Sequence, residues 1–248
     1  MDFKNVSFSY HTASGETLAL DNISFSVKSN EFVSIVGPSG CGKSTILSLI
    51  CGLLEPEKGS INIYGKESKV NTGYMLQRDH LFEWRNVYRN SVLGLEIQNK
   101  KNKENLENVE SMLIRYGLMS FKKARPSELS GGLRQRAALI RTLALKPDLL
   151  LLDEPFSALD YQTRLAVGND IGQIIRDENK TAILVTHDLA EAITLGNRIL
   201  ILSKRPAKVI YDLSLEFDEG LSPLQKRSTP VFQEYFQTVW EVLNNGKA

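Results

Sequence analysis

Apolar residues in this chain follow two different spacings, and the first of them predicts β-strands. Residues 149–152 and 182–185 are continuous apolar runs, which are typical of strands buried on both faces of a sheet. Other short apolar or alternating runs predict further strands. In chain order the predicted strands are residues 3–8, 23–27, 32–36, 60–64, 72–76, 149–153, 181–186, 198–203 and 208–213. A sheet buried in this way needs helices on its faces, so the sequence predicts a mostly parallel α/β core.

The second spacing, with apolar residues three and four positions apart, predicts helices. It begins after Lys43 and ends at Pro56, with apolar residues at Ile46, Leu47, Leu49, Ile50, Leu53 and Leu54. Residues 78–129 contain polar helical segments with few β-branched residues. We interpret them as a helical subdomain inserted into a core made of residues 1–77 and 130–212.

Residues 213–248 are predicted to form a C-terminal extension with a helix that starts at Thr229 and Pro230. One face of this helix is apolar and consists of Val231, Phe232, Tyr235, Phe236, Val239, Trp240 and Leu243. An apolar stripe is first of all a face that packs on its own domain, and we favour that interpretation. Docking to a partner is the alternative.

The overall composition argues against several classes of protein. Lys plus Arg (30) and Asp plus Glu (29) nearly cancel and are scattered, so the sequence shows no electrostatic footprint for nucleic acid. The two cysteines, Cys41 and Cys51, form no Cys-x-x-Cys pair, which does not favour a disulfide framework or structural zinc. Residues 1–10 alternate polar and apolar side chains, and no apolar run reaches the roughly 18 residues of a membrane span. We therefore expect a soluble intracellular chain whose membrane role depends on a partner.

A glycine-rich loop directly follows the predicted strand 32–36 and leads into the helix after Lys43. Its residues are Gly37, Pro38, Ser39, Gly40, Cys41, Gly42, Lys43, Ser44 and Thr45. Between a strand and a helix, such a loop lets backbone N–H groups converge on phosphate oxygens, and the helix N-terminus adds partial positive charge. Lys43 is suited to reach the β and γ phosphates, and the hydroxyl of Ser44 is suited to Mg²⁺. The sequence therefore predicts a site for a nucleoside triphosphate.

Two adjacent carboxylates end the apolar strand 149–153. This position puts Asp153 and Glu154 at the C-terminal edge of the sheet, where ligands bind in such folds. Asp153 is suited to coordinate Mg²⁺ through water, whereas Glu154 is suited to polarise a water for in-line attack on the γ-phosphate. An ordinary solvated acidic turn is the alternative.

A second glycine-rich element, Leu129-Ser130-Gly131-Gly132, starts a helix just before the carboxylate strand. It presents another helix N-terminus, which a nucleotide bound in the same chain could not reach. With its phosphate loop, the chain resembles the nucleotide-binding subunits of ATP-binding cassette (ABC) transporters, and Leu129-Ser130-Gly131-Gly132 stands where that family carries its signature sequence. The resemblance implies that Ser130, Gly131 and Gly132 close on the γ-phosphate bound by the other subunit. Leu133 replaces the glutamine usual in the family; we expect this to be tolerated, because the serine hydroxyl and the glycine N–H groups do the binding.

Further residues match the family in their order along the chain. Gln77 resembles the glutamine that contacts Mg²⁺ and the attacking water. Asp160 ends a loop, residues 157–160, that resembles the loop crossing the dimer interface. His187 resembles the switch histidine that contacts the γ-phosphate and orients Glu154. A lone histidine is more often an ordinary polar residue, so this assignment depends on its place after the strand 181–186.

Tyr10 resembles the aromatic residue that stacks on adenine in the family. An ordinary strand aromatic is the alternative, because Phe8 is close by.

The resemblance covers residues 2–213. It implies a P-loop NTPase core with a mostly parallel sheet, an antiparallel β subdomain, and an inserted helical subdomain with the signature element at its end. It also implies an ATPase with ATP and Mg²⁺ as cofactors, in which a homodimer holds two ATP and drives two integral-membrane permease subunits from the cytoplasmic face of the membrane. An extracytoplasmic solute-binding protein would be an indirect partner, and a nucleic acid partner is not expected.

Residues 81–87 resemble a stretch of the nitrate, sulfonate and taurine importer group, with Glu83 in place of its proline. Phe82 and Trp84 suit a groove that receives a cytoplasmic helix of a membrane partner, although packing within the insert explains them equally well. The resemblance to this group implies import of a small anionic or polar solute. An exporter or lipid-transport cassette, or a soluble ABC ATPase acting on DNA or ribosomes, would share the ATP chemistry and remains an alternative.

Cys41 lies in the phosphate loop close to a helix N-terminus. We hypothesise that this position lowers its thiol pKa, so that alkylation blocks ATPase activity and Mg·ATP protects. A small residue that merely fits is the alternative.

Overall fold

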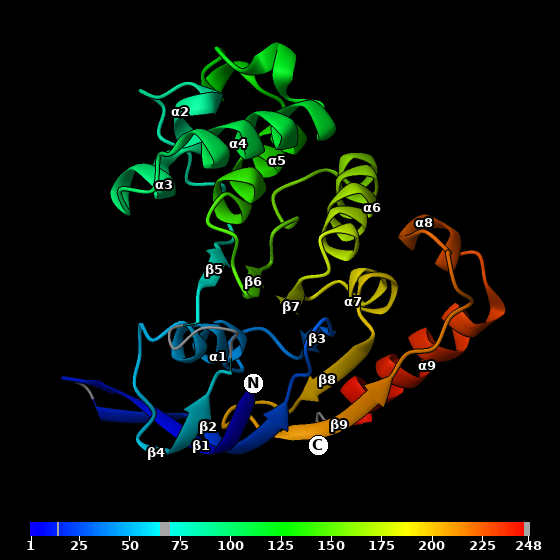
Figure 1. The fold of residues 1–248 in the computed structure, drawn as a ribbon. Coiled ribbons are helices and arrows are strands. Elements are labelled where there is room, and N and C mark those ends of the chain that lie inside the picture. The colour runs from blue at the N-terminus through cyan, green and yellow to red at the C-terminus, as the bar shows by residue number, and fades with distance from the viewer. Residues whose placement is uncertain (14, 65–69, 246–248) are drawn as a thin grey trace.

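In the computed structural model, which describes residues 1–13, 15–64 and 70–245, two sheets and the helices around them form layers (Figure 1). The larger sheet has the strand order β5-β6-β7-β3-β8-β9. Its strands are β3 (Phe32–Val36), β5 (Thr72–Met75), β6 (Leu149–Asp153), β7 (Thr181–Val185), β8 (Arg198–Leu202) and β9 (Val209–Ser214). All neighbours pair in parallel except β8 and β9. The predicted, mostly parallel sheet is confirmed, and all residues of β3 and β6 are buried, as their apolar runs require.

The smaller sheet is antiparallel, with the order β2-β1-β4. Its strands are β1 (Asp2–Thr12), β2 (Gly15–Ser26) and β4 (Lys58–Asn62). β1 and β2 are much longer than the predicted strands 3–8 and 23–27. The extra residues are mostly exposed and pair with one another along the hairpin, so cross-strand pairing extends these strands beyond their apolar stretches.

Helix α1 (Lys43–Ile50) packs between the two sheets, in one cluster with inward residues of both. The predicted helix to Pro56 is too long. The helix ends because Gly52 adopts a positive φ of 74°, and Leu53 is then 70 % exposed.

The chain between β5 and β6 is helical and lies at the top of Figure 1. It contains α2 (Val87–Ser91), α3 (Leu93–Ile97), α4 (Lys103–Arg115), two 3₁₀ turns (Met119–Phe121 and Pro126–Glu128) and α5 (Gly131–Leu143). Helices α5 and α6 (Tyr161–Asp177) share a core with the other face of the parallel strands. The inserted helical subdomain is confirmed as part of the fold, whereas its boundaries at residues 78 and 129 stay a prediction.

Helices α7 (Leu189–Leu195) and α9 (Pro230–Asn245) pack on the large sheet beside β8, and α8 (Pro223–Lys226) packs against α6 and α7. The favoured interpretation of the C-terminal helix is confirmed, because Phe232 and Val239 are buried in a cluster with residues of α7 and β8. Trp240 of the same predicted stripe is 54 % exposed. Among the helices of the described residues, none has both the length and the apolar character that crossing a membrane requires.

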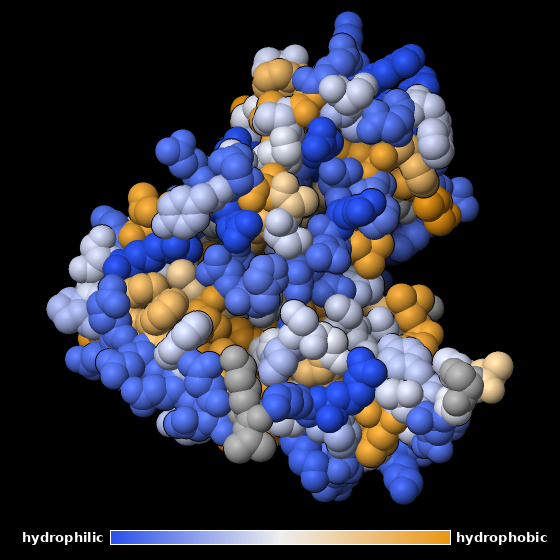
Figure 2. All heavy atoms as spheres, turned by 180° about the vertical axis from the view of Figure 1, so that it is seen from behind, coloured by the Kyte–Doolittle hydropathy of each residue, from blue (hydrophilic) through white to orange (hydrophobic). Residues whose placement is uncertain are grey.

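The face shown in Figure 2 is largely hydrophilic, and its hydrophobic residues lie in separate patches. The outline is indented on one side, between the helical part above and the sheets below.

Candidate nucleotide-binding site

The glycine-rich loop joins the end of β3 to the start of α1. Gly40 and Gly42 have positive φ angles of 73° and 122°, conformations that other residues rarely adopt. A Cβ atom on Gly42 would also lie 2.8 Å from Leu20 Cδ2. Gly42 is the N-cap of α1, and a glycine has no side chain with which to bond the first turn. The N–H groups that start α1 therefore have no side-chain cap, which is the arrangement that binds phosphate.

Two basic side chains hold this loop. The Nζ of Lys43 donates to the carbonyl oxygens of Gly37 (2.9 Å) and Pro38 (3.0 Å), and the residue is only 6 % exposed. The guanidinium of Arg205 donates to the carbonyl oxygen of Gly40 through Nη2 (2.7 Å) and Nε (3.2 Å). Two cations thus lie at a loop shaped for an anion. Arg205 was not predicted, because it comes from the turn after β8, far along the chain.

A pocket of about 300 Å³ lies over this loop. It is lined by Tyr10, Ala19, Ser39, Gly40, Gly42, Lys43, Ser44, Thr45, Glu154 and Arg205. All of these except Ala19 and Arg205 are predicted site residues. The volume is at the lower end of the range for small-molecule sites.

Tyr10 has features of both interpretations given above. Its ring contacts the ring of Phe8 edge-on, with centroids 5.0 Å apart, as a strand aromatic would. Its hydroxyl lies 3.0 Å from Thr45 Oγ1, and its ring lines the pocket with 42 % of the residue exposed. The structure thus places an accessible aromatic ring beside the start of α1.

The predicted lowering of the thiol pKa of Cys41 is wrong. Cys41 is 1 % exposed, and burial raises the pKa of its thiol, outweighing the opposing charge of Lys43. The side chain belongs to the core beneath the loop, where it packs in one cluster with α1 and the sheets. The sequence showed that Cys41 lies near a helix N-terminus, but it did not show that the side chain is buried.

Asp153 lies at the end of β6, next to the start of α1. Its Oδ1 accepts a hydrogen bond from Ser44 Oγ (3.0 Å), and its Oδ2 accepts one from the hydroxyl of Tyr74 (3.1 Å). The carboxyl group is largely buried, and burial raises its pKa. Burial, together with the charge of Asp153, also raises the pKa of Tyr74. A hydroxyl and a carboxylate in contact are oxygen ligands of the kind that Mg²⁺ takes, so this pair fits the ion. Tyr74 was not predicted.

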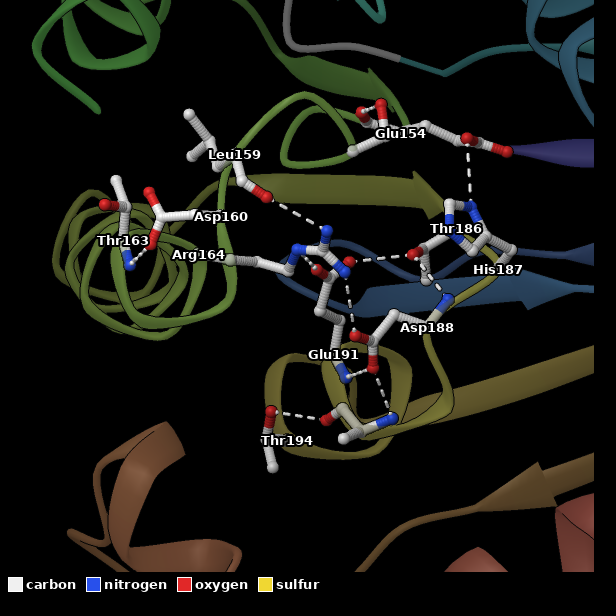
Figure 3. Close-up of polar contacts among 12 residues, drawn as sticks. Glu154, Leu159, Asp160, Thr163, Arg164, Thr186, His187, Asp188, Glu191 and Thr194 are labelled. Carbon is white, nitrogen blue, oxygen red and sulfur yellow. Dashed lines mark hydrogen bonds and ion pairs between the residues drawn. The ribbon is translucent and has the colours of Figure 1, made fainter. Parts of the chain in front are cut away.

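Glu154 joins three segments at the carboxyl edge of the sheet, and Figure 3 shows its contact with His187. Its Oε2 lies 3.0 Å from His187 Nδ1 and accepts a hydrogen bond from Gln77 Nε2 (3.3 Å). These residues follow β6, β7 and β5, three adjacent strands. Glu154 has a positive φ of 44°, which is uncommon for a residue with a side chain, and its N–H donates to Val185 O (2.8 Å). Gln77 Nε2 also donates to Ser157 Oγ (3.4 Å). The structure thus brings together the predicted residues Gln77, Glu154 and His187.

The second glycine-rich element lies elsewhere in the chain. Ser130 is exposed and caps α5, accepting a hydrogen bond from Leu133 N (3.4 Å). Gly132 is buried against α6, where a Cβ atom would lie 2.8 Å from Val167 Cγ2. Asp160 is exposed and caps α6 through Thr163 N (3.1 Å), a bond that lowers its pKa. Of the described residues that line the phosphate-loop pocket, none comes from 130–132 or is residue 160.

Comparisons with known proteins agree with this geometry. Residues 20–157 match the family model described as ABC transporter. The chain is 44 % identical to an uncharacterized ABC transporter ATP-binding protein of Bacillus subtilis, covering 97 % of this chain and 94 % of that protein. It is 34 % identical to a taurine import ATP-binding protein of Jannaschia sp., covering 96 % and 93 %. A solved dimeric ATP-binding cassette in a post-hydrolysis state, bound to ADP and phosphate, has a TM-score of 0.70 at 29 % identity, covering 88 % of this chain and 99 % of that one. The chain therefore belongs to the ABC transporter family, as an ATP-hydrolysing, ATP-binding subunit with the P-loop NTPase fold.

Proposed function

We propose that two copies of this chain enclose two ATP molecules with Mg²⁺ and drive the permease of an importer for a small anionic or polar solute, such as a taurine-like compound. The observation that carries the proposal is the separation of the site into two parts. The pocket, the carboxylates and the histidine lie together, while Ser130 and the start of α5 are exposed outside the pocket of their own chain. A second copy would bring this helix N-terminus to the γ-phosphate.

The residues present fit ATP and Mg²⁺. We assign the phosphates to the loop of residues 37–45 with the ammonium of Lys43, and the adenine to the exposed ring of Tyr10. Ser44, Asp153 and Gln77 would hold Mg²⁺, which supplies charge neutralisation on the phosphate oxygens when bound.

In the proposed hydrolysis, the carboxylate of Glu154 positions the attacking water and accepts a hydrogen bond from it. The amide of Gln77 and the imidazole of His187 keep that carboxylate in place, as their contacts of 3.3 Å and 3.0 Å with Oε2 indicate. Ser130, Gly131 and Gly132 of the second copy would donate to the γ-phosphate, and Asp160 would lie at the interface between the copies.

The proposed permease contact involves the segment after Gln77. The rings of Phe82 and Trp84 stack with centroids 4.6 Å apart, and Trp84 is 72 % exposed, so the stack leaves an aromatic face open to a partner. Two permease subunits there would place the chain at the cytoplasmic face of the membrane, with an extracytoplasmic solute-binding protein as an indirect partner. The relative that imports taurine supports this assignment over an exporter.

We further propose that the chain is organised in three units: an ATP-binding core of residues 1–77 and 130–212, a helical insert of residues 78–129, and an extension of residues 213–248. The helical content between β5 and β6 and the C-terminal position of α9 support this division.

The substitution Glu154→Gln tests the proposed catalytic role. It should leave ATP affinity within about twofold but lower turnover by roughly 10²–10³-fold, because an amide cannot accept the proton or polarise the water as a carboxylate does. Light scattering should show a dimer with ATP. Glu107→Gln, at a side chain that is 66 % exposed, is the matched control. Turnover of Glu154→Gln at the wild-type rate would overturn the assignment.

Trp84→Ala tests the permease contact. We expect it to reduce copurification with the permease from solubilised membranes while leaving the ATPase rate of the purified subunit unchanged, because Trp84 lies outside the pocket. Copurification of nucleic acid or ribosomes, with no membrane protein, would support the alternative of a soluble ATPase.

A further inference from the structure

A cluster of polar side chains, two buried and two half-buried, lies behind His187, between α6 and α7 (Figure 3). Its members are Arg164, Thr186, Asp188 and Glu191, and none of them lines the phosphate-loop pocket. Thr186 is 1 % exposed and Glu191 is 5 % exposed. Burying an ionisable side chain is costly unless its partners compensate, so this cluster needs an explanation beyond packing.

Thr186 fixes the backbone on both sides of His187. Its hydroxyl donates to Glu191 Oε2 (2.7 Å) and accepts a hydrogen bond from the backbone N–H of Asp188 (3.0 Å). In the sequence, His187 lies between Thr186 and Asp188, and its Nδ1 lies 3.0 Å from Glu154 Oε2. The direction in which the imidazole points therefore depends on the bonds of the Thr186 hydroxyl.

Arg164 connects this segment to the loop that carries Asp160. Its Nη2 donates to the carbonyl oxygen of Leu159 (3.0 Å), the residue just before Asp160, and its Nη1 lies 3.5 Å from Asp188 Oδ2. One guanidinium thus contacts both the end of the 157–160 loop and the segment that holds His187.

The contact between Arg164 and Glu191 is incomplete. Arg164 Nε is buried and has no hydrogen-bond partner among the described residues, and Glu191 Oε1 lies 3.9 Å from it. Burial raises the pKa of Glu191 to about 7, against the hydrogen bond from Thr186 and the charge of Arg164. A hydrogen bond requires roughly 2.7–3.2 Å, so an approach of about 1 Å between α6 and α7 would complete this pair.

We infer that Arg164, Thr186 and Glu191 are positioning residues for ATP hydrolysis, which hold His187 against Glu154 and connect that contact to the loop of Asp160. The inference rests on the proposed function, in which Asp160 faces the second copy. If this loop moves when the copies close, the Leu159 carbonyl would displace Arg164. Arg164 would in turn displace Asp188, which is next to His187. The hydrolytic contact would then depend on dimer closure.

The competing explanation is that the cluster only stabilises the packing of α6 against α7. The two explanations predict different effects of losing the Thr186 hydroxyl. A packing role lowers the melting temperature and leaves the rate alone, whereas a positioning role lowers kcat and leaves the KM for ATP alone.

The experiment compares Thr186→Val, which removes the hydroxyl at nearly constant shape, with Thr186→Ser, which keeps it. Thr194→Val is the matched control: Thr194 is also 1 % exposed, and its hydroxyl donates to Ala190 O (2.7 Å) outside the cluster. We expect Thr186→Val to lower kcat about tenfold with KM within about twofold, a loss typical of one or two hydrogen bonds. Thr186→Ser and Thr194→Val should stay within about twofold of the wild-type kcat. A wild-type kcat for Thr186→Val, or an equal loss in Thr194→Val, would overturn the inference.

A second measurement asks whether Arg164 acts through His187. Arg164→Gln should lower kcat in the wild-type background and have no further effect on the residual rate of His187→Ala. Independent, multiplying losses would overturn the inference. If His187→Ala turned over at the wild-type rate, the proposed role of His187 would itself fail, and this inference with it. Impaired His187→Ala beside a fully active Thr186→Val would overturn the inference alone.

Discussion

Two glycine-rich segments start helices in this chain, and their helix N-termini are built differently. Helix α1 begins after Gly42, which has no side chain that could cap the first turn. Helix α5 begins after Ser130, whose hydroxyl accepts a hydrogen bond from the N–H of Leu133. The first N-terminus lies in a pocket beside Lys43, whereas the second is exposed through Ser130.

The difference indicates which partner each terminus uses. Free N–H donors in a pocket with two cations need an anion, and a nucleotide supplies one within the same chain. At a helix start with a serine cap, one of the free N–H groups already has a hydrogen-bond acceptor, so the helix start is stable in a single chain. In the proposed dimer it would contact the nucleotide of the second copy. Changes at the first N-terminus should therefore impair ATP binding, and changes at the second should impair turnover alone.

The largest effect is expected from Lys43→Met, at the first N-terminus. Loss of the buried ammonium would remove the proposed charge-assisted hydrogen bonds to the phosphates, so affinity for a non-hydrolysable ATP analogue should fall roughly 100-fold in titration calorimetry. Lys103→Met, at a side chain that is 90 % exposed, is the control and should bind normally. Unchanged affinity in Lys43→Met would contradict the claim that the N-terminus of α1 binds ATP.

A matched pair of glycine substitutions separates the two termini more finely. A Cβ atom on Gly42 or on Gly132 would meet a side-chain methyl at the same distance, 2.8 Å. Only Gly42 also has a positive φ and lies in the phosphate loop. Gly42→Ala should lower ATP affinity about 10-fold to 100-fold, because backbone strain of this kind costs roughly 1–3 kcal/mol.

Gly132→Ala should instead leave ATP affinity within about twofold and lower turnover, because the start of α5 must shift away from α6. Calorimetry and a phosphate-release assay on both variants provide the measurement. Equal losses of affinity in the two variants would mean that the two termini do not have separate roles.

Ser130→Ala tests the cap itself. We expect turnover to fall about tenfold, while the stability cost stays near the roughly 1 kcal/mol typical of a lost N-cap. Ser222→Ala is a matched control, because Ser222 caps α8 in the same way through Gln225 N (3.3 Å) and lies outside the pocket. If both variants lost stability equally and neither lost activity, the hydroxyl of Ser130 would be only a cap.

Local patterns were sufficient to predict much of this architecture. The parallel sheet followed from continuous apolar runs, and the place of Asp153 and Glu154 at its carboxyl edge followed from the apolar strand before them. That Gln77 and His187 meet Glu154 there was implied only by the family resemblance. These predictions succeeded because the carboxyl ends of parallel strands share one edge of the sheet.

Residues supplied by topology could not be predicted in this way. Arg205 reaches the loop because β8 pairs with β3, and Tyr74 reaches Asp153 because β5 pairs with β6. No sequence spacing encodes these pairings. The prediction of a lowered thiol pKa for Cys41 failed for a related reason, since the burial of this side chain depends on packing from distant segments.

The smallest effect is expected from Leu133→Gln, which introduces the residue usual at this position in the family. The hydrogen bond that caps α5 uses the backbone N–H of residue 133, and it survives any change of that side chain. Leu133 is partly buried against the core cluster, so the glutamine should cost stability of about 1 kcal/mol or less through lost apolar contact. Turnover should stay within about twofold of wild type, because in the proposed dimer the groups that would face the phosphate are the serine hydroxyl and the glycine N–H groups. The measurement is a steady-state ATPase assay beside a thermal melt, with Leu53→Gln at a 70 % exposed position as the control.

A change in turnover of about tenfold in either direction would mean that side chain 133 itself contacts the second copy. The exposed N-terminus of α5 would then include a third kind of contact besides the hydroxyl and the backbone.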